Sequence, residues 1–118
     1  MLFRSEPFAP GASRNVLDGL LAMILNGSRR MLLDLQRAIV EADFRAEAAA
    51  LRLPVTLIHG DRDASAPLDL TGRRYAALIP GAELVVYEGV AHGVMVTHPH
   101  RLAADIARVV TGAVAQAA

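Results

Sequence analysis

The chain has 118 residues, with twelve basic and twelve acidic side chains and a formal net charge of zero. Its composition, 53% hydrophobic and 20% charged, is typical of a globular domain. The balanced charge argues against a nucleic-acid or membrane-surface partner, and the absence of cysteine excludes disulfides, thiolate metal sites and a cysteine nucleophile. Without a long apolar run or an N-terminal signal pattern, the default expectation for location is the cytoplasm.

The N-terminal residues carry no periodic pattern. Pro7, Pro10 and Gly11 predict an irregular lead-in over residues 1–12. Residues 2–5, Leu-Phe-Arg-Ser, can be encoded by the end of a common sequencing-adapter oligonucleotide. We therefore interpret residues 1–5 as an assembly artefact.

Residues 13–52 have the apolar spacing of helices. One helix is predicted over residues 13–25, with Ser13 as its N-cap, and another over residues 29–41 after a break at residues 26–28. A short turn or helix follows near residues 44–51.

From residue 53 onward the pattern changes to alternating strands and helices. The first predicted element is an apolar strand at residues 55–58, buried on both faces, which a turn at 59–61 ends. A helix from Pro67 to Ile79, a strand at 83–87 and a loop at 88–98 follow. The last predicted element is a helix from Pro99 to about Val114, whose inward-facing residues are Leu102, Ile106, Val109 and Val110. This order indicates an α/β fold with parallel strands. Two strands leave faces and edges uncovered, so we expect further chain upstream.

Two chemically capable residues follow the two predicted strands. Asp63 ends the turn Gly60-Asp61-Arg62-Asp63, and His92 lies 29 residues later in a His-Gly pair. Loops after neighbouring parallel strands converge at one edge of the sheet, so the two side chains should meet there. A carboxylate that accepts an imidazole N–H fixes the tautomer and stabilises the imidazolium. Taken singly, each residue also fits a plain structural role, Asp63 in an Asx-type turn and His92 in a loop.

The segments LPVTLIHGDRDASAP and PGAELVVYEGVAHGVMVTHP resemble the last two core strands of the α/β-hydrolase superfamily. The resemblance is closest to the cofactor-free haloperoxidase, aryl esterase and perhydrolase branch. It implies that residues 13–52 are the end of a helical cap and that residues 53–118 are the C-terminal part of the core. It also implies that Asp63 is the acid and His92 the base of a catalytic triad.

The same resemblance implies a serine hydrolase acting on small esters, lactones or carboxylic acids, the last with peroxide. It implies no metal or cofactor, and a homo-oligomeric assembly. The family nucleophile sits in a Gly-x-Ser-x-Gly elbow. None of the four serines, Ser5, Ser13, Ser28 and Ser65, has that context. We therefore expect a truncated hydrolase, inactive by itself. The alternatives are a non-catalytic short chain acting as an interaction or oligomer module, and complementation by a serine-bearing partner chain.

Other residues near the motifs have weaker assignments. Ser65 and Leu68 follow the acid and Val94 follows the base, so these three are the candidates for substrate contacts. Val94 and its neighbour Met95 also fit a plain role in core packing. Asp61 competes with Asp63 for the role of the acid. The remaining histidines are interpreted as structural: His59 at a strand end, and His98 and His100 at a helix start. A metal site made from His92, His98 and His100 is not expected, because no carboxylate is spaced to complete it.

Overall fold

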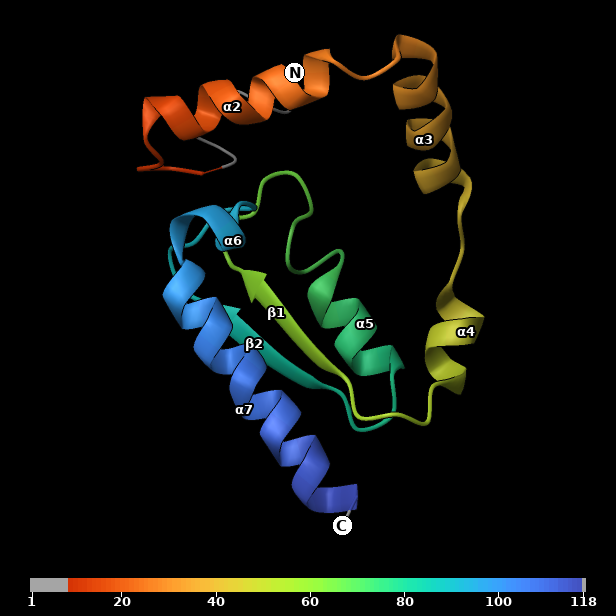
Figure 1. Cartoon of the computed structure of the whole chain (residues 1–118). Coiled ribbons are helices and arrows are strands. Elements are labelled where there is room, and N and C mark those ends of the chain that lie inside the picture. Colours follow the sequence, from red (N-terminus) through yellow and green to blue (C-terminus); the bar gives the residue numbers. More distant parts are fainter. Residues whose placement is uncertain (1–8, 118) are drawn as a thin grey trace.

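The structure is a computed structural model that describes residues 9–117, with side chains as far as residue 112. The interpretation of residues 1–5 as an artefact, and most of the predicted lead-in, lie outside the described residues. The helices and strands in chain order (Figure 1) are α2 (Arg14–Leu25), α3 (Arg29–Glu41), α4 (Arg45–Ala50), β1 (Thr56–Gly60), α5 (Gly72–Leu78), β2 (Glu83–Tyr87), α6 (Val94–Thr97) and α7 (Pro99–Ala117).

The two N-terminal helices form where the apolar spacing predicted them. Ser13 caps α2 by accepting a hydrogen bond from the backbone N–H of Val16, and Ser28 caps α3 through Met31 in the same way. Such caps satisfy backbone donors that have no partner inside the helix. The predictions of helices over residues 13–25 and 29–41 are therefore confirmed.

The two strands form a parallel pair with the register Thr56↔Glu83 through Gly60↔Tyr87. The predicted turn at residues 59–61 is wrong for its first two residues. His59 and Gly60 continue the ladder opposite Val86 and Tyr87, so β1 runs two residues further and the turn begins at Asp61. The second strand has the predicted bounds.

Two helix boundaries also differ from the predictions. Pro67 precedes a turn rather than a helix. The backbone N–H groups of Leu70 and Thr71 bond to its carbonyl, and α5 starts only at Gly72. The predicted loop at residues 88–98 contains the short helix α6. The last helix begins at Pro99 as predicted and extends to Ala117.

Helices α5 and α7 cover opposite faces of the strand pair (Figure 1). The ring of His59 lies against Gly72 of α5, whereas the next pair along the ladder, Gly60↔Tyr87, faces the other way. On that side the Tyr87 hydroxyl donates to Asp105 of α7 at 2.5 Å, and Arg101 of α7 stacks 3.7 Å from the ring centroid. Tyr87 is fully buried and joins β2 to α7.

The sheet is less covered than its sequence predicted. Of β1, only Gly60 is buried, so the prediction of a strand buried on both faces is wrong for this chain. Within α7, Leu102 and Val109 are half-buried, but Ile106 and Val110 are 50% and 56% exposed, so their predicted inward positions are wrong. The reason is that the described residues place no further strand or helix against these faces.

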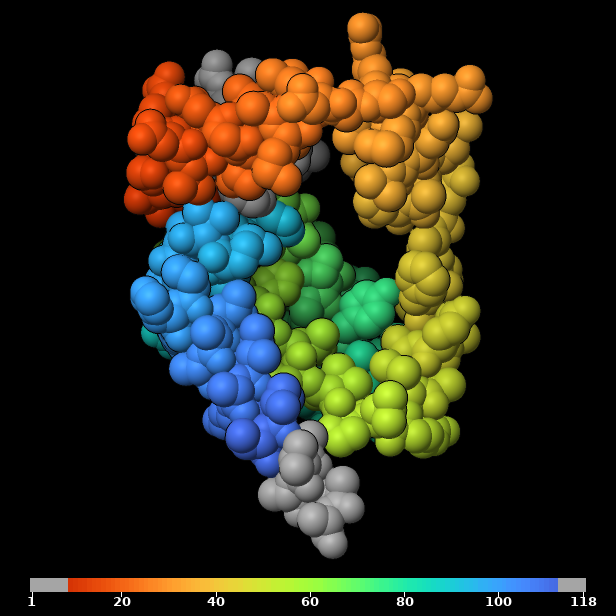
Figure 2. Space-filling model, in the orientation of Figure 1, coloured from red at the N-terminus to blue at the C-terminus, as the bar shows by residue number. Residues whose placement is uncertain are grey.

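Apolar side chains are also exposed along the N-terminal helices. Met23 and Leu25 of α2 are each 73% exposed, and Val40 of α3 is 74% exposed. Figure 2 shows that α3 and the segment that leads to α4 arch away from the strands and leave an open gap. In the part of the chain that the structure describes, no helix is both long and apolar enough to span a membrane.

We expect the 118-residue chain alone to unfold broadly and to bind a hydrophobic dye, because a two-stranded parallel sheet with exposed apolar helices lacks a complete core. Scanning calorimetry together with anilinonaphthalene sulfonate fluorescence measures both properties. A sharp unfolding transition with a large enthalpy and no dye binding would contradict this expectation.

Candidate active site

Asp63 lies in the loop after β1, at the carboxyl end of the strand pair. Its side chain is buried, with 8% of the residue exposed. One carboxylate oxygen, Oδ1, accepts hydrogen bonds from the backbone N–H groups of Ser65 at 2.9 Å and Ala66 at 2.8 Å. These bonds fold the loop back on the carboxylate as an Asx-type turn.

His92 lies in the loop after β2 and contacts the other oxygen of the same carboxylate. Its Nδ1 is 2.7 Å from Oδ2 of Asp63, although 29 residues separate them in the sequence. The His92 side chain is 40% exposed, whereas the Asp63 side chain is 5% exposed. The ring is therefore held on its inner side by a buried acid and reaches the surface on its outer side.

The two loops meet because Gly60 has no side chain. A Cβ built at Gly60 would lie 2.1 Å from the carbonyl oxygen of Val90 and 2.9 Å from that of Ala91. The same Val90 carbonyl accepts the backbone N–H of Arg62 at 2.9 Å. The chain that leads to His92 thus crosses directly over the end of β1, which brings His92 to Asp63.

Asp61 joins the same two loops through a hydrogen bond on the molecular surface. Its Oδ1 accepts the backbone N–H of Gly89 at 2.6 Å, and Gly89 adopts the left-handed conformation with φ of 73°. Asp61 is exposed and bonds to the backbone of the loop, whereas the carboxylate that meets His92 belongs to Asp63.

The surroundings of Asp63 favour its charged form. Burial by itself raises the pKa of this carboxyl, but the hydrogen bonds from the Ala66 N–H and from His92, with the charge of His92, outweigh burial. The pKa of Asp63 therefore lies below its ordinary value, and the side chain is a carboxylate at neutral pH.

A cavity of about 310 Å³ opens beside the pair. It is lined by Ile58, His59, Gly60, Asp63, Ala66, His92, Val94, Met95 and Leu102. Of the three candidates for substrate contacts, Val94 lines it, together with its neighbour Met95. Ser65 and Leu68 do not: Ser65 is half-buried in the Asx turn, and Leu68 is buried with its Cδ1 near Gly72 of α5.

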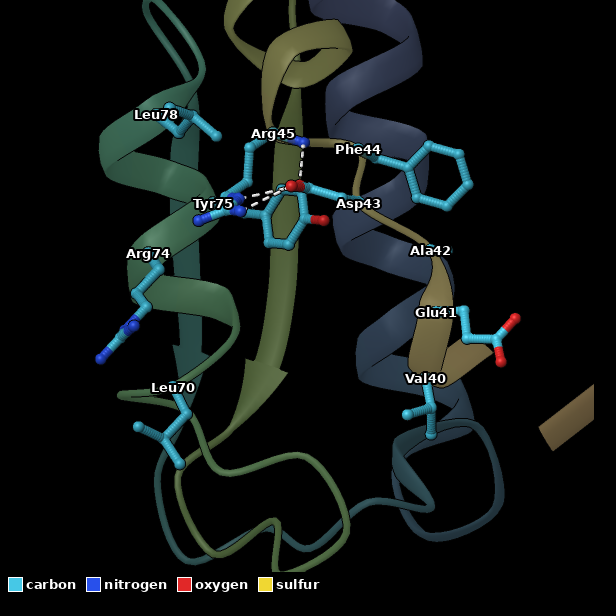
Figure 3. A pocket seen from close by; sticks show the side chains of 10 residues that line it. All are labelled: Val40, Glu41, Ala42, Asp43, Phe44, Arg45, Leu70, Arg74, Tyr75 and Leu78. Carbon is cyan, nitrogen blue, oxygen red and sulfur yellow. Dashed lines mark hydrogen bonds and ion pairs between the residues drawn. The ribbon is translucent and has the colours of Figure 1, made fainter. Parts of the chain in front are cut away.

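A second cavity, of about 570 Å³, lies between the segment that joins α3 to α4 and one side of α5. Figure 3 shows Asp43 and Arg45 joined by hydrogen bonds there, with Tyr75 close by. The bonds from Arg45 lower the pKa of Asp43 to about 2. Neither Asp63 nor His92 lines this cavity. Among the described residues, no group of three or more histidines and carboxylates is arranged to hold a metal ion.

Comparison with known proteins identifies relatives of one kind. The chain is 46% identical over 52 residues to the non-heme chloroperoxidase CPO-A1 of Kitasatospora aureofaciens, covering 44% of this chain and 19% of that protein. It is 28% identical over 99 residues to a non-heme haloperoxidase of Rhodococcus erythropolis, covering 82% of this chain and 36% of the relative. It is 28% identical over 69 residues to a bifunctional esterase/perhydrolase of Acinetobacter calcoaceticus, covering 58% of this chain and 25% of that protein.

The fold matches that of a solved structure. The crystal structure of a bromoperoxidase from Bacillus anthracis superposes with a TM-score of 0.86 at 24% identity, over 92% of this chain and 41% of the other. The chain therefore has the α/β-hydrolase fold of that bromoperoxidase. In sequence it is similar to non-heme haloperoxidases and to an esterase/perhydrolase. It spans between about a fifth and a third of the length of these three curated relatives. No protein-family model matches the sequence.

Sequence reasoning missed two residues of the site. The sequence pattern indicates Gly60 only as part of a turn, although its missing side chain lets the two loops cross. His59 lies next to the end of β1, in agreement with its predicted strand-end position, and its Nε2 is in addition 2.9 Å from the Ala66 carbonyl oxygen and 3.4 Å from Oδ2 of Asp63. The position of both directly before the Asp61–Asp63 turn was the one available signal.

The site is best tested in a fusion protein in which residues 9–118 replace the C-terminal part of the Rhodococcus erythropolis haloperoxidase, which would cover the exposed apolar faces. In this fusion, we expect Gly60→Ala to break the Asp63–His92 contact, because the new Cβ meets backbone atoms that cannot move aside. The far-downfield proton resonance of His92 Nδ1–H reports this bond. Gly112→Ala is the control, since a Cβ there meets nothing within 4 Å. An unchanged resonance in Gly60→Ala would contradict the role of the crossing.

We expect His92→Asn to raise the pKa of Asp63 toward the ordinary value of about 3.9, because the variant removes a donor and a charge. A depressed carboxyl pKa stabilises the fold above the unfolded-state pKa, and this contribution is lost as pH falls through the folded value. Carbon-13 NMR titration of the Asp63 carboxyl in the fusion measures the shift. His100→Asn, on the exposed start of α7, should leave it unchanged.

Proposed function

We propose that this chain supplies the acid and the base of a serine hydrolase, with Asp63 as the acid and His92 as the base. The observation that carries the proposal is the 2.7 Å contact between Nδ1 of His92 and the buried Asp63 carboxylate. A carboxylate at this nitrogen holds the imidazole in the tautomer that leaves Nε2 as the proton acceptor.

In the proposed mechanism, Nε2 of His92 takes the proton of a serine hydroxyl as that oxygen attacks a carbonyl carbon, and later donates it to the leaving group. The negative charge of Asp63 stabilises the imidazolium between the two steps. The serine and the oxyanion-hole donors would come from a part of a longer protein outside these 118 residues. By itself, the chain is proposed to be inactive, because removal of the nucleophile of a triad costs several orders of magnitude in rate.

The proposed substrates are small esters and lactones, and carboxylic acids with peroxide. The names of relatives as haloperoxidases and as an esterase/perhydrolase support this class. The apolar cavity lined by Val94 and Met95 beside the pair is compatible with a small acyl group. The mechanism needs neither metal nor cofactor, because side chains perform each proton transfer. A cytoplasmic location and a homo-oligomeric assembly remain part of the proposal.

A second candidate function is a non-catalytic module that binds a partner or assembles with its own copies. The exposed apolar side chains of α2 and α3 favour it, since such surfaces are commonly covered by protein. The two candidates differ in what substitution of Asp63 and His92 should do: a module should tolerate it.

We expect Asp63→Asn and His92→Gln each to lower kcat for hydrolysis of p-nitrophenyl acetate by about 10³–10⁴-fold in the fusion protein, because both act in the same proton transfer. Matched controls are Asp69→Asn, whose carboxylate is 83% exposed and pairs only with Arg73 on the surface, and His100→Gln. The controls should keep the activity of the unsubstituted fusion. Wild-type rates in both site variants would refute the triad roles.

The origin of the nucleophile is tested on the DNA. A long read upstream of the codon for Glu6 is expected to show an open frame that encodes a Gly-x-Ser-x-Gly elbow. An in-frame stop and a ribosome-binding site just before Met1 would instead favour the non-catalytic module.

A further inference from the structure

We propose that His59 is a positioning residue that fixes the orientation of the Asp63 carboxylate. The proposal rests on the triad roles given above and assigns a function to the second histidine of the site. His59 does not contact the reacting atoms; it acts through Asp63.

The His59 ring occupies one defined position at the end of β1. Its side chain is 16% exposed. Its Nδ1 lies where a side chain on Gly72 would otherwise be, 2.8 Å from a Cβ built at that residue. Gly72 is the buried first residue of α5, so the close approach of strand and helix depends on a glycine there. Helix α5 therefore packs against one side of the His59 ring.

On its other side the ring organises the acid loop. Nε2 lies 2.9 Å from the carbonyl oxygen of Ala66, which can only accept, so Nε2 carries the hydrogen and donates it. The N–H of the same residue, Ala66, donates to Oδ1 of Asp63 at 2.8 Å. His59 thus holds Ala66 in place, and Ala66 holds one oxygen of the acid.

The Nε2 atom itself lies 3.4 Å from Oδ2 of Asp63, the oxygen that meets His92. Two imidazoles therefore approach one oxygen, while two backbone N–H groups bind the other. Three hydrogen bonds and the close His59 ring restrain rotation of the carboxylate. Without His59, the carboxylate and its loop could rotate away from His92, and a small displacement of a triad member costs about 10²-fold in rate.

Substitutions at His59 in the fusion protein separate positioning from plain packing. His59→Leu keeps bulk and removes the donor, whereas His59→Gln can bring an amide N–H close to the position of Nε2. Thr111→Val is the control, because the Thr111 hydroxyl donates to the backbone carbonyl of Ala107 at 2.8 Å within α7 and bonds neither to Ala66 nor to Asp63. The readouts are kcat and KM with p-nitrophenyl acetate and the downfield Nδ1–H resonance of His92.

We expect His59→Leu to lower kcat about 10- to 100-fold with a smaller change in KM, and to shift or broaden the His92 resonance. His59→Gln should restore most of both, and Thr111→Val should change neither. If His59→Leu does not fold, His59→Asn replaces it, because its shorter amide cannot reach Ala66 and should show the same loss. Unchanged kcat and resonance in the leucine or asparagine variant, or equal losses in all of the variants including Thr111→Val, would overturn the proposal.

Failure of this inference is distinguishable from failure of the triad roles. If Asp63→Asn abolishes activity but the His59 variants keep it, only the positioning role is wrong. If Asp63→Asn keeps full activity, the triad roles are wrong, and the His92 resonance alone then decides whether His59 orients the carboxylate.

Discussion

The crossing of two loops over Gly60 is the constraint on which the candidate site depends. The carbonyl of Val90 lies so close to the end of β1 that no side chain fits between them, and the N–H of Arg62 bonds to that carbonyl. Asp61 reinforces the crossing through Gly89. Parallel strands bring these loops to one edge of the sheet, but only the absent side chain lets them approach to the 2.7 Å that separates His92 from Asp63.

Asp63 combines two features that its sequence context offers as alternatives, an Asx-type turn and a contact with His92. Its Oδ1 closes an Asx-type turn by binding two backbone N–H groups, and its Oδ2 meets His92. The turn role is what makes the second contact possible, because it fixes the carboxylate in the loop. The residues between Asp63 and Thr71 form this turn and a second one after Pro67, so α5 begins only at Gly72.

Sequence patterns predicted the parts of the fold that local rules determine. The capped helices α2 and α3, and the bounds of β2, follow from periodicity and capping. The meeting of Asp63 with His92 could be predicted because each follows a strand of a parallel pair. The contacts of Gly60 and His59 could not, since they depend on how closely a loop and a helix approach, which no spacing encodes. Burial of β1 was mispredicted because it depends on neighbours that the described residues do not supply.

The geometry of the acid–base pair is determined locally, whereas the covering of the fold is not. Among the described residues, the hydrogen bonds of the Asp63 carboxylate, including the one to His92, join residues between His59 and His92. Helices α2 and α3 instead expose apolar side chains such as Met23 and Val40. A segment whose site is internally braced but whose surface is incomplete should keep the arrangement of its acid and base when other protein covers it. For that reason a fusion to a relative can test the chemistry of these residues separately from the stability of the chain alone.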